Sequence, residues 1–309
     1  MEPENESLYK YKGLYFITDL ISPENLDSLD SFEIRDDDTF IITYPKSGKF
    51  KDIFQERVNL VSNAVIQFLN GTENISLIDR APWLEYNIFH VDLPSCSSPR
   101  VICSHLPYYL VPKGLQNKRA KIIYVLRNPK DVLVSDYHFH KISVRVETPK
   151  EFDMFLDKFL AGKVFCSSWL DHVEGWYCHK SDFNILFLSH EEMKKVGCVS
   201  VKFCTENMHL PRKKLTEKEV DDVVDKATSD NMKVDSRANY TFMPPDVLDF
   251  SKGNFLRTIG DWKNLMTVAQ SERFDRVFKE RMEKLLFKFC WDIQEDPQPI
   301  SSSAEENNM

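Results

Sequence analysis

Short apolar runs alternate with amphipathic stretches along the first two thirds of the chain. Four runs predict strands that are buried on both faces: Phe40–Tyr44, Val101–Ser104, Ile122–Leu126 and Ile185–Leu188. Apolar residues recur at helical spacing over Pro129–His140 and Pro149–Leu160. Because strands that alternate with helices form βαβ units, the pattern predicts a single α/β domain with a central, mostly parallel sheet flanked by helices.

The C-terminal part of the chain has a different pattern. A long charged stretch, Ala269–Phe289, predicts a surface helix that packs on the domain. From Gln294 to Met309 the chain is polar and has no apolar period, which is typical of disorder. We see no internal repeat and no linker, so we expect one domain over residues 1–296 and a disordered tail over residues 297–309.

Composition and charge narrow the possible partners. The chain has 309 residues, of which 42% are hydrophobic, so it can bury a sizeable core. A formal net charge of −8 argues against a general nucleic-acid or membrane-surface binder. Residues 1–10 lack the apolar stretch of a signal peptide, and no run approaches the ~18 apolar residues of a membrane span. Seven cysteines without a CxxC pair indicate thiols in a reducing compartment, and we expect a cytoplasmic protein.

The first predicted strand leads into a short polar loop. Residues 44–48 read Tyr-Pro-Lys-Ser-Gly, which places a cation and backbone N–H groups at a strand end, where they can hold a phosphate-like anion. The loop is not a Walker A motif, because Phe50 follows Lys49 where that motif has the hydroxyl that binds magnesium. This departure disfavours an ATPase or kinase. Taken alone, the loop is also compatible with a plain turn that exposes Lys46.

Two more predicted strands end in polar residues. Arg127 follows a buried strand and precedes a helix that carries Ser135, and an arginine so placed can bind two phosphate oxygens while the serine adds a hydroxyl. His105 follows another strand, where a neutral imidazole can accept a proton from a nucleophile. Either residue alone is also compatible with a structural role. Ligands of parallel sheets bind at the carboxyl ends of the strands, so we expect these ends to form one site.

Taken in this order, the motifs resemble those of the cytosolic sulfotransferase family over nearly the whole chain. Residues 44–48 are similar to the start of the family's loop for the 5′-phosphosulfate of the donor, 3′-phosphoadenylyl sulfate (PAPS), and the segment from Arg127 to Ser135 to its 3′-phosphate segment. His105 falls on the family's catalytic base, and residues 260–264, Gly-Asp-Trp-Lys-Asn, match its C-terminal signature. Residues 104–115 and 166–170 look closest to the amine sulfotransferase branch.

The resemblance implies a chemistry and partners. A sulfonate group would move from PAPS to the amine or hydroxyl of a small, largely apolar or aromatic acceptor: an amine, a phenol or an alcohol. His105 would act as the base and Lys46 would stabilise the leaving phosphate, with no metal required. The spacing K-x-x-x-T-V-x-x-x-E implies a homodimer formed through Lys263, Thr267, Val268 and Glu272. Xenobiotic metabolism is the biological setting that the family suggests.

The resemblance also implies which residues contact the ligands. The donor would be bound by Lys46, Ser47, Gly48, Lys49, Phe50, Arg127, Ser135, His190, Thr228 and Arg257. Candidate residues of the acceptor pocket are Trp83, Leu84, Tyr86, Phe139, His140 and Tyr240, whose aromatic character suits a flat apolar molecule. For any single one of these positions, ordinary core packing is the more common explanation.

Two departures from the family pattern support a second hypothesis. Lys49, Phe50 and Lys51 stand where the family has two threonines and a tryptophan, and residues 49–71 match the family poorly. After Arg257 the family's Lys-Gly pair is missing. Charged hydrogen bonds lost in this way cost ~1.5–3 kcal/mol each. The alternative is therefore a catalytically weak or inactive member with a damaged donor site, acting as a dimerising or ligand-binding protein.

Overall fold

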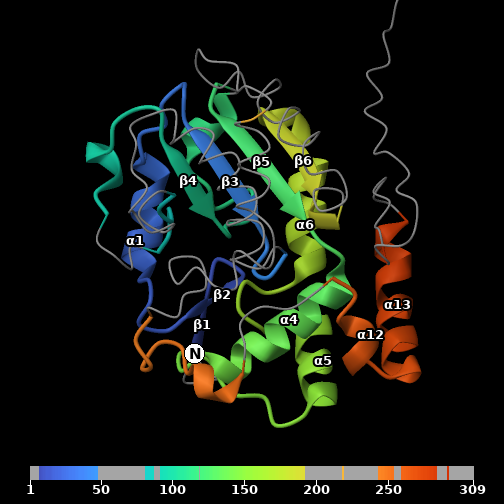
Figure 1. Cartoon of the computed structure of the whole chain (residues 1–309). Helices are drawn as coiled ribbons and strands as arrows, with labels where there is room; N and C mark the ends of the chain where they lie inside the picture. The colour runs from blue at the N-terminus through green and yellow to red at the C-terminus, as the bar shows by residue number, and fades with distance from the viewer. Residues whose placement is uncertain are drawn as a thin grey trace, which may run out of the picture.

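A four-stranded parallel sheet lies at the centre of the protein (Figure 1). The computed structural model describes residues 7–47, 81–86, 91–117, 119–191, 218, 243–253, 259–283 and 291. The strand order is β4-β3-β5-β6, and each neighbouring pair is parallel. The strands are β3 (Thr39–Thr43), β4 (Val101–Ser104), β5 (Lys121–Leu126) and β6 (Ile185–Ser189). This arrangement confirms the predicted α/β fold.

The four predicted strands all form, but one prediction about their burial is wrong. Every residue of β3 and β4 is buried, as is β5 after its first residue. Along β6, in contrast, every residue is only half-buried. The reason is its position, because among the described strands β6 pairs with β5 alone and forms an edge of the sheet.

Two helices follow β5 and lie beyond the carboxyl ends of the strands (Figure 1). Helix α4 spans Pro129–Ile142, and the Asn128 side chain caps it by accepting the Lys130 N–H at 3.0 Å. Helix α5 spans Phe152–Leu160. We predicted that α5 begins at Pro149, but Glu151 has extended dihedral angles (φ −136°, ψ 151°) and is the N-cap, so the helix begins three residues later.

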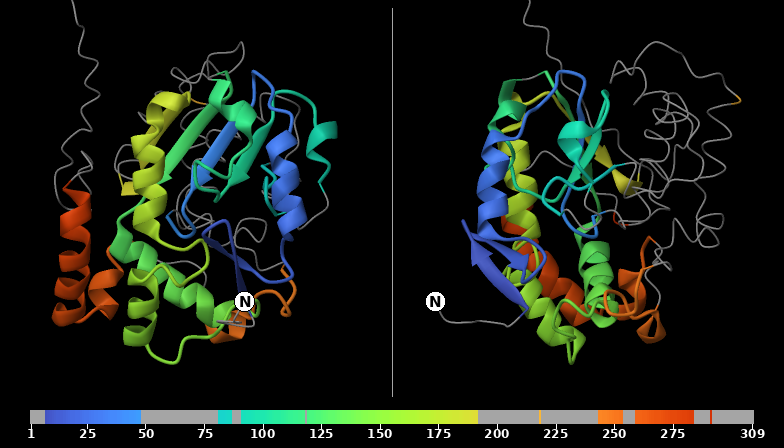
Figure 2. Two further views of the ribbon diagram at one scale, coloured as in Figure 1. Left: turned by 180° about the vertical axis from the view of Figure 1, so that it is seen from behind. Right: turned by 90° about the vertical axis from the view of Figure 1, so that its left-hand side faces the viewer.

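Helices also cover a face of the sheet. Helices α1 (Pro23–Ser28) and α6 (Trp169–Cys178) lie on the same side of it (Figure 2). Each begins at a serine whose hydroxyl accepts a backbone N–H of the first turn: Ser22 for α1 and Ser168 for α6. Short 3₁₀ turns occupy Leu29–Ser31, Leu93–Ser95, Lys113–Asn117, Lys180–Asp182 and Phe250–Lys252.

The C-terminal helices pack beside α4 and α5 (Figure 1). Helix α12 spans Trp262–Leu265 and α13 spans Val268–Met282. A capping box fixes the start of α13, because the side chains of Thr267 and Gln270 each accept the other's backbone N–H. The predicted start of this helix at Ala269 is therefore correct within one residue. Its predicted continuation over residues 284–289, the helical face expected within residues 49–71 and the tail after Gln294 lie outside the described residues.

An N-terminal hairpin, which we did not predict, joins the core near the ends of the strands. Strands β1 (Leu8–Tyr11) and β2 (Leu14–Ile17) pair antiparallel. Lys12 and Gly13 connect them with φ values of 47° and 89°, the left-handed pair that a tight hairpin turn requires. The Tyr15 N–H donates to the Ser167 hydroxyl at 2.9 Å, which ties the hairpin to the turn before α6.

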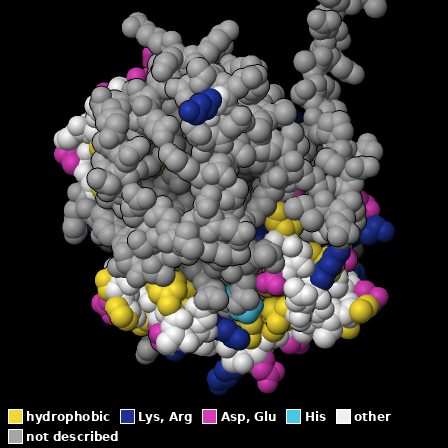
Figure 3. Space-filling view, in the orientation of Figure 1, with side chains coloured by type: hydrophobic (Ala, Val, Ile, Leu, Met, Phe, Trp, Pro, Cys, Tyr) yellow, Lys and Arg dark blue, Asp and Glu magenta, His cyan; other side chains and the backbone are white. Residues whose placement is uncertain are grey.

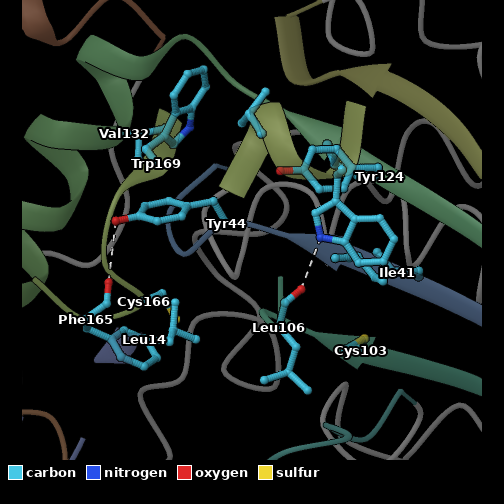
Figure 4. Packing of buried hydrophobic residues seen from close by; sticks show 14 of the residues in the cluster. Leu14, Ile41, Tyr44, Cys103, Leu106, Tyr124, Val132, Phe165, Cys166 and Trp169 are labelled. Atoms are coloured by element: carbon cyan, nitrogen blue, oxygen red, sulfur yellow. Dashed lines mark hydrogen bonds between the residues drawn. The ribbon is translucent and has the colours of Figure 1, made fainter. Parts of the chain in front are cut away.

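Polar atoms within the core are paired across long sequence separations. In Figure 4 the Tyr44 hydroxyl points toward the Phe165 carbonyl, and its shorter bond, of 2.7 Å, is to the carbonyl of Ser167. The Trp176 indole N–H donates to the Leu106 carbonyl at 3.2 Å. These bonds fix the loops at the carboxyl ends of β3 and β4 against α6 and the turn before it.

The described surface and helices give two further observations. On the face drawn in Figure 3, basic, acidic and hydrophobic side chains are interspersed over the described lower part of the molecule. Within the described ranges, no helix is both long and apolar enough to cross a membrane.

Candidate active site

The loop after β3 holds a lysine in an unusual backbone conformation. The Ser47 N–H donates to the Tyr44 carbonyl at 3.0 Å, which closes a turn, and Lys46 within it has a φ of 65°. A side chain in this left-handed region costs roughly 1–2 kcal/mol, so the surrounding packing must hold it. The Lys46 side chain is buried, and its Nζ lies 4.2 Å from the centroid of the Phe139 ring on α4. The predicted cation therefore lies at the strand end and points toward α4.

Ser47 is buried beside Lys46 and is held by a residue from the start of α6. Its hydroxyl accepts the Trp169 indole N–H at 3.2 Å. Gly48, Lys49 and Phe50, which we predicted to complete the loop, lie outside the described residues. The described part of the loop thus supplies one ammonium group and one hydroxyl.

His105 lies at the end of β4, next to the lysine loop. Its Nδ1 lies 2.6 Å from the Thr43 carbonyl oxygen. Because a carbonyl only accepts, Nδ1 carries the proton and the lone pair is on Nε2. Burial, with the nearby charges of His172 and Lys46, lowers the pKa of His105 to about 3 and outweighs the opposing bond to Thr43. The imidazole is therefore neutral at physiological pH, as a general base must be.

A buried carboxylate, which the sequence did not reveal, positions His105. The Glu85 Oε1 accepts the backbone N–H of His105 at 2.6 Å. Burial raises the pKa of Glu85 to about 7, although this bond and others oppose the rise. Glu85 thus fixes the backbone of the candidate base and itself titrates near neutral pH. A sequence signal was lacking, because the two residues come from separate loops.

We expect Glu85→Gln to change the pH dependence of stability. The folded-state pKa of Glu85, about 7, is above its ordinary value of 4.5, so the folded protein favours the protonated carboxyl. As the pH rises through 7 this proton is lost, and the folded state loses the corresponding stability. Gln keeps the acceptor for His105 and cannot ionise, so the variant should gain on the order of 3 kcal/mol over wild type at pH 8, a gain that vanishes near pH 4.5. Melting curves at pH 5 and pH 8 measure it, and a difference between the proteins that is equal at both pH values contradicts the assignment.

Arg127 is fully buried at the end of β5, and its guanidinium group has unused hydrogen-bonding capacity. Nη1 donates to the Lys46 carbonyl at 3.2 Å, which joins the ends of β3 and β5. In the described structure, Nε and Nη2 are buried and donate to no acceptor. Buried polar groups are nearly always satisfied, and a planar pair of N–H groups fits two oxygens of a phosphate. Arg127 is therefore preorganised for an oxyanion.

Ser135 and His190, two further residues of the predicted donor site, are both buried. Ser135 is buried on α4, and its hydroxyl has no hydrogen-bond partner among the residues described. His190 is buried after β6, with Nδ1 3.8 Å from the Glu191 Oε1, and Glu191 in turn accepts the N–H of Asn128 at 2.9 Å. The two other predicted donor residues, Thr228 and Arg257, lie outside the described residues.

The C-terminal signature packs against the start of α4. Both oxygens of the Asp131 carboxylate accept backbone N–H groups from it: that of Gly260 at 2.8 Å and that of Trp262 at 3.2 Å. The Lys130 ammonium lies 4.6 Å from the Trp262 ring and forms an ion pair with Asp275 at 2.7 Å. These contacts attach residues 260–262 and α13 to the helix that follows Arg127.

Aromatic rings form a wall next to His105. The centroid of the Trp83 ring lies 4.4 Å from that of His105, and the centroid of the Phe165 ring lies 6.3 Å from it. Tyr86 is within 6.1 Å of Phe165. Of the predicted acceptor positions, Trp83, Leu84, Tyr86 and His140 are buried, Phe139 is half-buried and Tyr240 lies outside the described residues. Phe165 is an addition that sequence reasoning missed, because only the turn before α6 brings it to His105.

The site is rich in cations and hydroxyls and poor in metal ligands. Within the described segments, no group of three His, Cys, Asp or Glu side chains could hold a metal ion. The strand ends carry an ammonium, a guanidinium, a hydroxyl and a neutral imidazole, from Lys46, Arg127, Ser47 and His105, and α4 carries the buried hydroxyl of Ser135. This set can bind a doubly phosphorylated anion and accept a proton.

Comparison with known proteins shows to which protein family the chain belongs. The family described as "Sulfotransferase domain" matches residues 36–285, and the chain therefore belongs to the sulfotransferase family. Amine sulfotransferase of Oryctolagus cuniculus is 46% identical over 303 residues, covering 96% of this chain and 97% of that protein. Sulfotransferase 2B1 of Rattus norvegicus is 38% identical, covering 94% of this chain and 84% of the relative.

A solved structure agrees with the fold. Mouse sulfotransferase SULT7A1, crystallised with PAP, has a TM-score of 0.71 and 31% sequence identity, covering 90% of this chain and 95% of the mouse chain. The predicted resemblance to the sulfotransferases, and to the amine branch in particular, is thus confirmed. The chain is accordingly an enzyme of the transferase class.

Proposed function

We propose that this enzyme transfers a sulfonate group from PAPS to the amine or hydroxyl of a small, largely apolar or aromatic acceptor. The observation that carries the proposal is a set of unused donors at the end of β5 and on α4: Nε and Nη2 of Arg127 and the hydroxyl of Ser135, all buried and without a partner in the described structure. Donors left unused in this way fit a phosphate group that is bound during the reaction. The mouse sulfotransferase crystallised with PAP supports this donor.

In this proposal, different residues bind the two ends of PAPS. Arg127 and Ser135 are the residues for the 3′-phosphate, since they supply two guanidinium N–H groups and a hydroxyl. Lys46 and Ser47 are the residues for the 5′ end, next to the reacting sulfur. The hydrogen bond from Arg127 Nη1 to the Lys46 carbonyl couples the two halves of the site. We assign His190 to the same region, because it precedes Glu191, which accepts the N–H of Asn128 next to Arg127.

The proposed reaction is an in-line displacement at sulfur. The acceptor's nitrogen or oxygen forms a bond to sulfur while the bond between sulfur and the phosphate oxygen breaks, and PAP leaves. Nε2 of His105 takes the acceptor's proton, because Nδ1 is held by the Thr43 carbonyl. Lys46 stabilises the negative charge that grows on the departing oxygen. The proposal uses no metal, because the ammonium, the guanidinium and backbone N–H groups neutralise the charge.

A transfer assay tests the proposal. The protein is incubated with PAPS labelled with ³⁵S and a mixed panel of aromatic amines, phenols and alcohols, and PAP binding is titrated by calorimetry. We expect labelled product and PAP binding below the millimolar range. Binding without product would favour the inactive, ligand-binding alternative. No binding at all would mean that the altered residues 49–51 and the missing Lys-Gly after Arg257 have destroyed the donor site.

We further propose that the enzyme is a homodimer formed through Lys263, Thr267, Val268 and Glu272. Val268, the first residue of α13, has 75% of its surface exposed, which is unusual for an aliphatic side chain and suits an interface. Val268→Lys should therefore give a monomer. Light scattering after size exclusion measures the mass, and Val277→Lys on the same helix is the matched control that should stay dimeric. A wild-type protein of monomer mass refutes the interface.

The remaining proposals concern the domain boundaries, the location of the protein in the cell and its metabolic role. We propose a sulfotransferase domain over residues 1–296, which includes the matched range 36–285, and a disordered tail over residues 297–309. A cytoplasmic location and a part in xenobiotic metabolism follow from the same family reasoning. Limited proteolysis that removes residues 297–309 without loss of activity would support the boundary.

A further inference from the structure

A buried carboxylate on α4 plays no part in the reaction proposed above. Asp136 directly follows Ser135 and is 1% exposed, yet in the described structure both its oxygens are buried and accept no hydrogen bond. A buried carboxylate usually has an ion-pair or hydrogen-bond partner, because leaving it without one is costly. Its neighbour on the next turn, His140, is equally buried, and the two side chains approach to 3.8 Å between Nε2 and Oδ1.

The two side chains present acceptors rather than donors. His140 Nδ1 lies 3.2 Å from the Glu147 carbonyl oxygen, so Nδ1 carries a proton, and in the neutral ring Nε2 holds a lone pair. Nε2 is buried and has no partner among the described residues. Three acceptors therefore converge: Oδ1 and Oδ2 of Asp136 and Nε2 of His140. One positive group with three N–H donors, a primary ammonium, complements this set in both number and charge.

The pair borders the candidate active site. The Asp136 charge acts on Lys46 and Tyr44 of the loop after β3, and on Cys166 in the turn before α6. Cys166 follows Phe165, whose ring faces His105, and Phe139 on the same face of α4 lies against the Lys46 ammonium. A small acceptor with its nucleophile at His105 can thus extend along these rings toward Asp136.

We propose that Asp136 and His140 form a subsite that binds a primary ammonium group carried by the acceptor at a distance from its nucleophile. This inference rests on the proposed function, because it concerns the acceptor of that reaction. The nucleophile itself must be a neutral amine or a hydroxyl, since an ammonium has no lone pair. The favoured acceptor class is therefore a small aromatic molecule with a nucleophile at one end and a cationic amine at the other.

A cavity that His140 lines is not part of the subsite. It has a volume of about 100 Å³ and is lined in part by Lys150, Lys158 and Lys163. Asp136 does not line it.

Two acceptors of the same shape test the inference. Tyramine and 4-propylphenol share the phenol nucleophile and differ at the end of the side chain, which is an ammonium in tyramine and a methyl group in 4-propylphenol. We expect wild type to have the higher kcat/KM for O-sulfonation of tyramine. In Asp136→Asn, which keeps the shape and removes the charge, this preference should fall by about 10-fold or more. The kcat/KM for 4-propylphenol should change by less than about threefold.

Controls separate the subsite from other roles of Asp136. Asp153→Asn removes an exposed carboxylate from α5 and should leave the preference intact. If Asp136→Asn slows both acceptors equally, the carboxylate acts on Lys46 or on the fold, and the inference is wrong. It is also wrong if wild type shows no preference for tyramine.

A binding measurement keeps the inference testable without turnover. Calorimetry measures tyramine and 4-propylphenol binding to the protein saturated with PAP. Tighter tyramine binding that disappears in Asp136→Asn supports the subsite even if no product forms, in which case only the proposed reaction fails. Equal affinities for the two ligands in wild type overturn the subsite even if both are sulfonated.

Discussion

Replacing Arg127 with methionine is expected to weaken PAP binding by about 100- to 10,000-fold. The variant removes two buried N–H donors that have no other acceptor in the described structure. Each charged hydrogen bond to a phosphate contributes ~1.5–3 kcal/mol, and every 1.4 kcal/mol is a factor of ten in affinity. Calorimetric titration of PAP into both proteins measures the loss. Arg127→Lys, which keeps the charge without the planar pair of donors, should fall between them.

The 3′-phosphate provides the internal control for this prediction. Adenosine 5′-phosphate lacks that group, so Arg127→Met, which also removes the bond from Nη1 to the Lys46 carbonyl, should lower its affinity far less than that of PAP. Arg119→Met, which removes an exposed arginine paired with Asp36, should leave the affinity for PAP unchanged. If the Arg127 variant binds both nucleotides equally less well, Arg127 supports the fold of the site and does not contact the 3′-phosphate.

Replacing His105 with asparagine is expected to lower kcat by about 100- to 10,000-fold and to leave PAP affinity unchanged. The asparagine amide nitrogen can occupy the place of Nδ1 and keep the bond to the Thr43 carbonyl, 2.6 Å long in wild type, while the variant has no counterpart of Nε2. The variant therefore removes the base and preserves the contact that orients it. Single-turnover transfer of ³⁵S from saturating PAPS measures the chemical step directly.

A second histidine serves as the control for this effect. His179, at the end of α6, stacks on Tyr108 with ring centroids 3.8 Å apart and lies outside the candidate site. His179→Asn should keep the wild-type rate. A His105→Asn variant that transfers sulfonate at more than about a tenth of the wild-type rate would mean that proton removal by His105 does not limit the reaction.

The sequence predicted the parts of this molecule that local patterns determine. The apolar runs located the four strands, because a buried parallel strand is continuously hydrophobic and ends at polar residues. Since β3, β4 and β5 are parallel neighbours, Lys46, His105 and Arg127 had to meet at one edge of the sheet. The motif 44–47 and the segment from Arg127 to Ser135 are local as well, and a hydrogen bond joins Arg127 to Lys46 at that edge.

Long-range packing determined what the sequence did not predict. Glu85 reaches the His105 backbone from a loop that carries no periodic signal. Phe165 joins the aromatic wall through a turn in which Cys166 and Ser167 both have positive φ, a conformation that these residue types do not suggest. Asp136 looks like an ordinary polar helix residue in the sequence, and only its burial next to His140 makes it a candidate for binding.

A crystal structure of the protein with PAP tests the central claim most directly, because the claim is a placement of atoms. We predict that the 3′-phosphate oxygens lie about 3 Å from Nε and Nη2 of Arg127 and from the Ser135 hydroxyl, with the 5′-phosphate at Lys46 and Ser47. The three donors that have no acceptor in the described structure would then all be satisfied. A bound nucleotide whose phosphates contact neither Arg127 nor Ser135 would contradict the account.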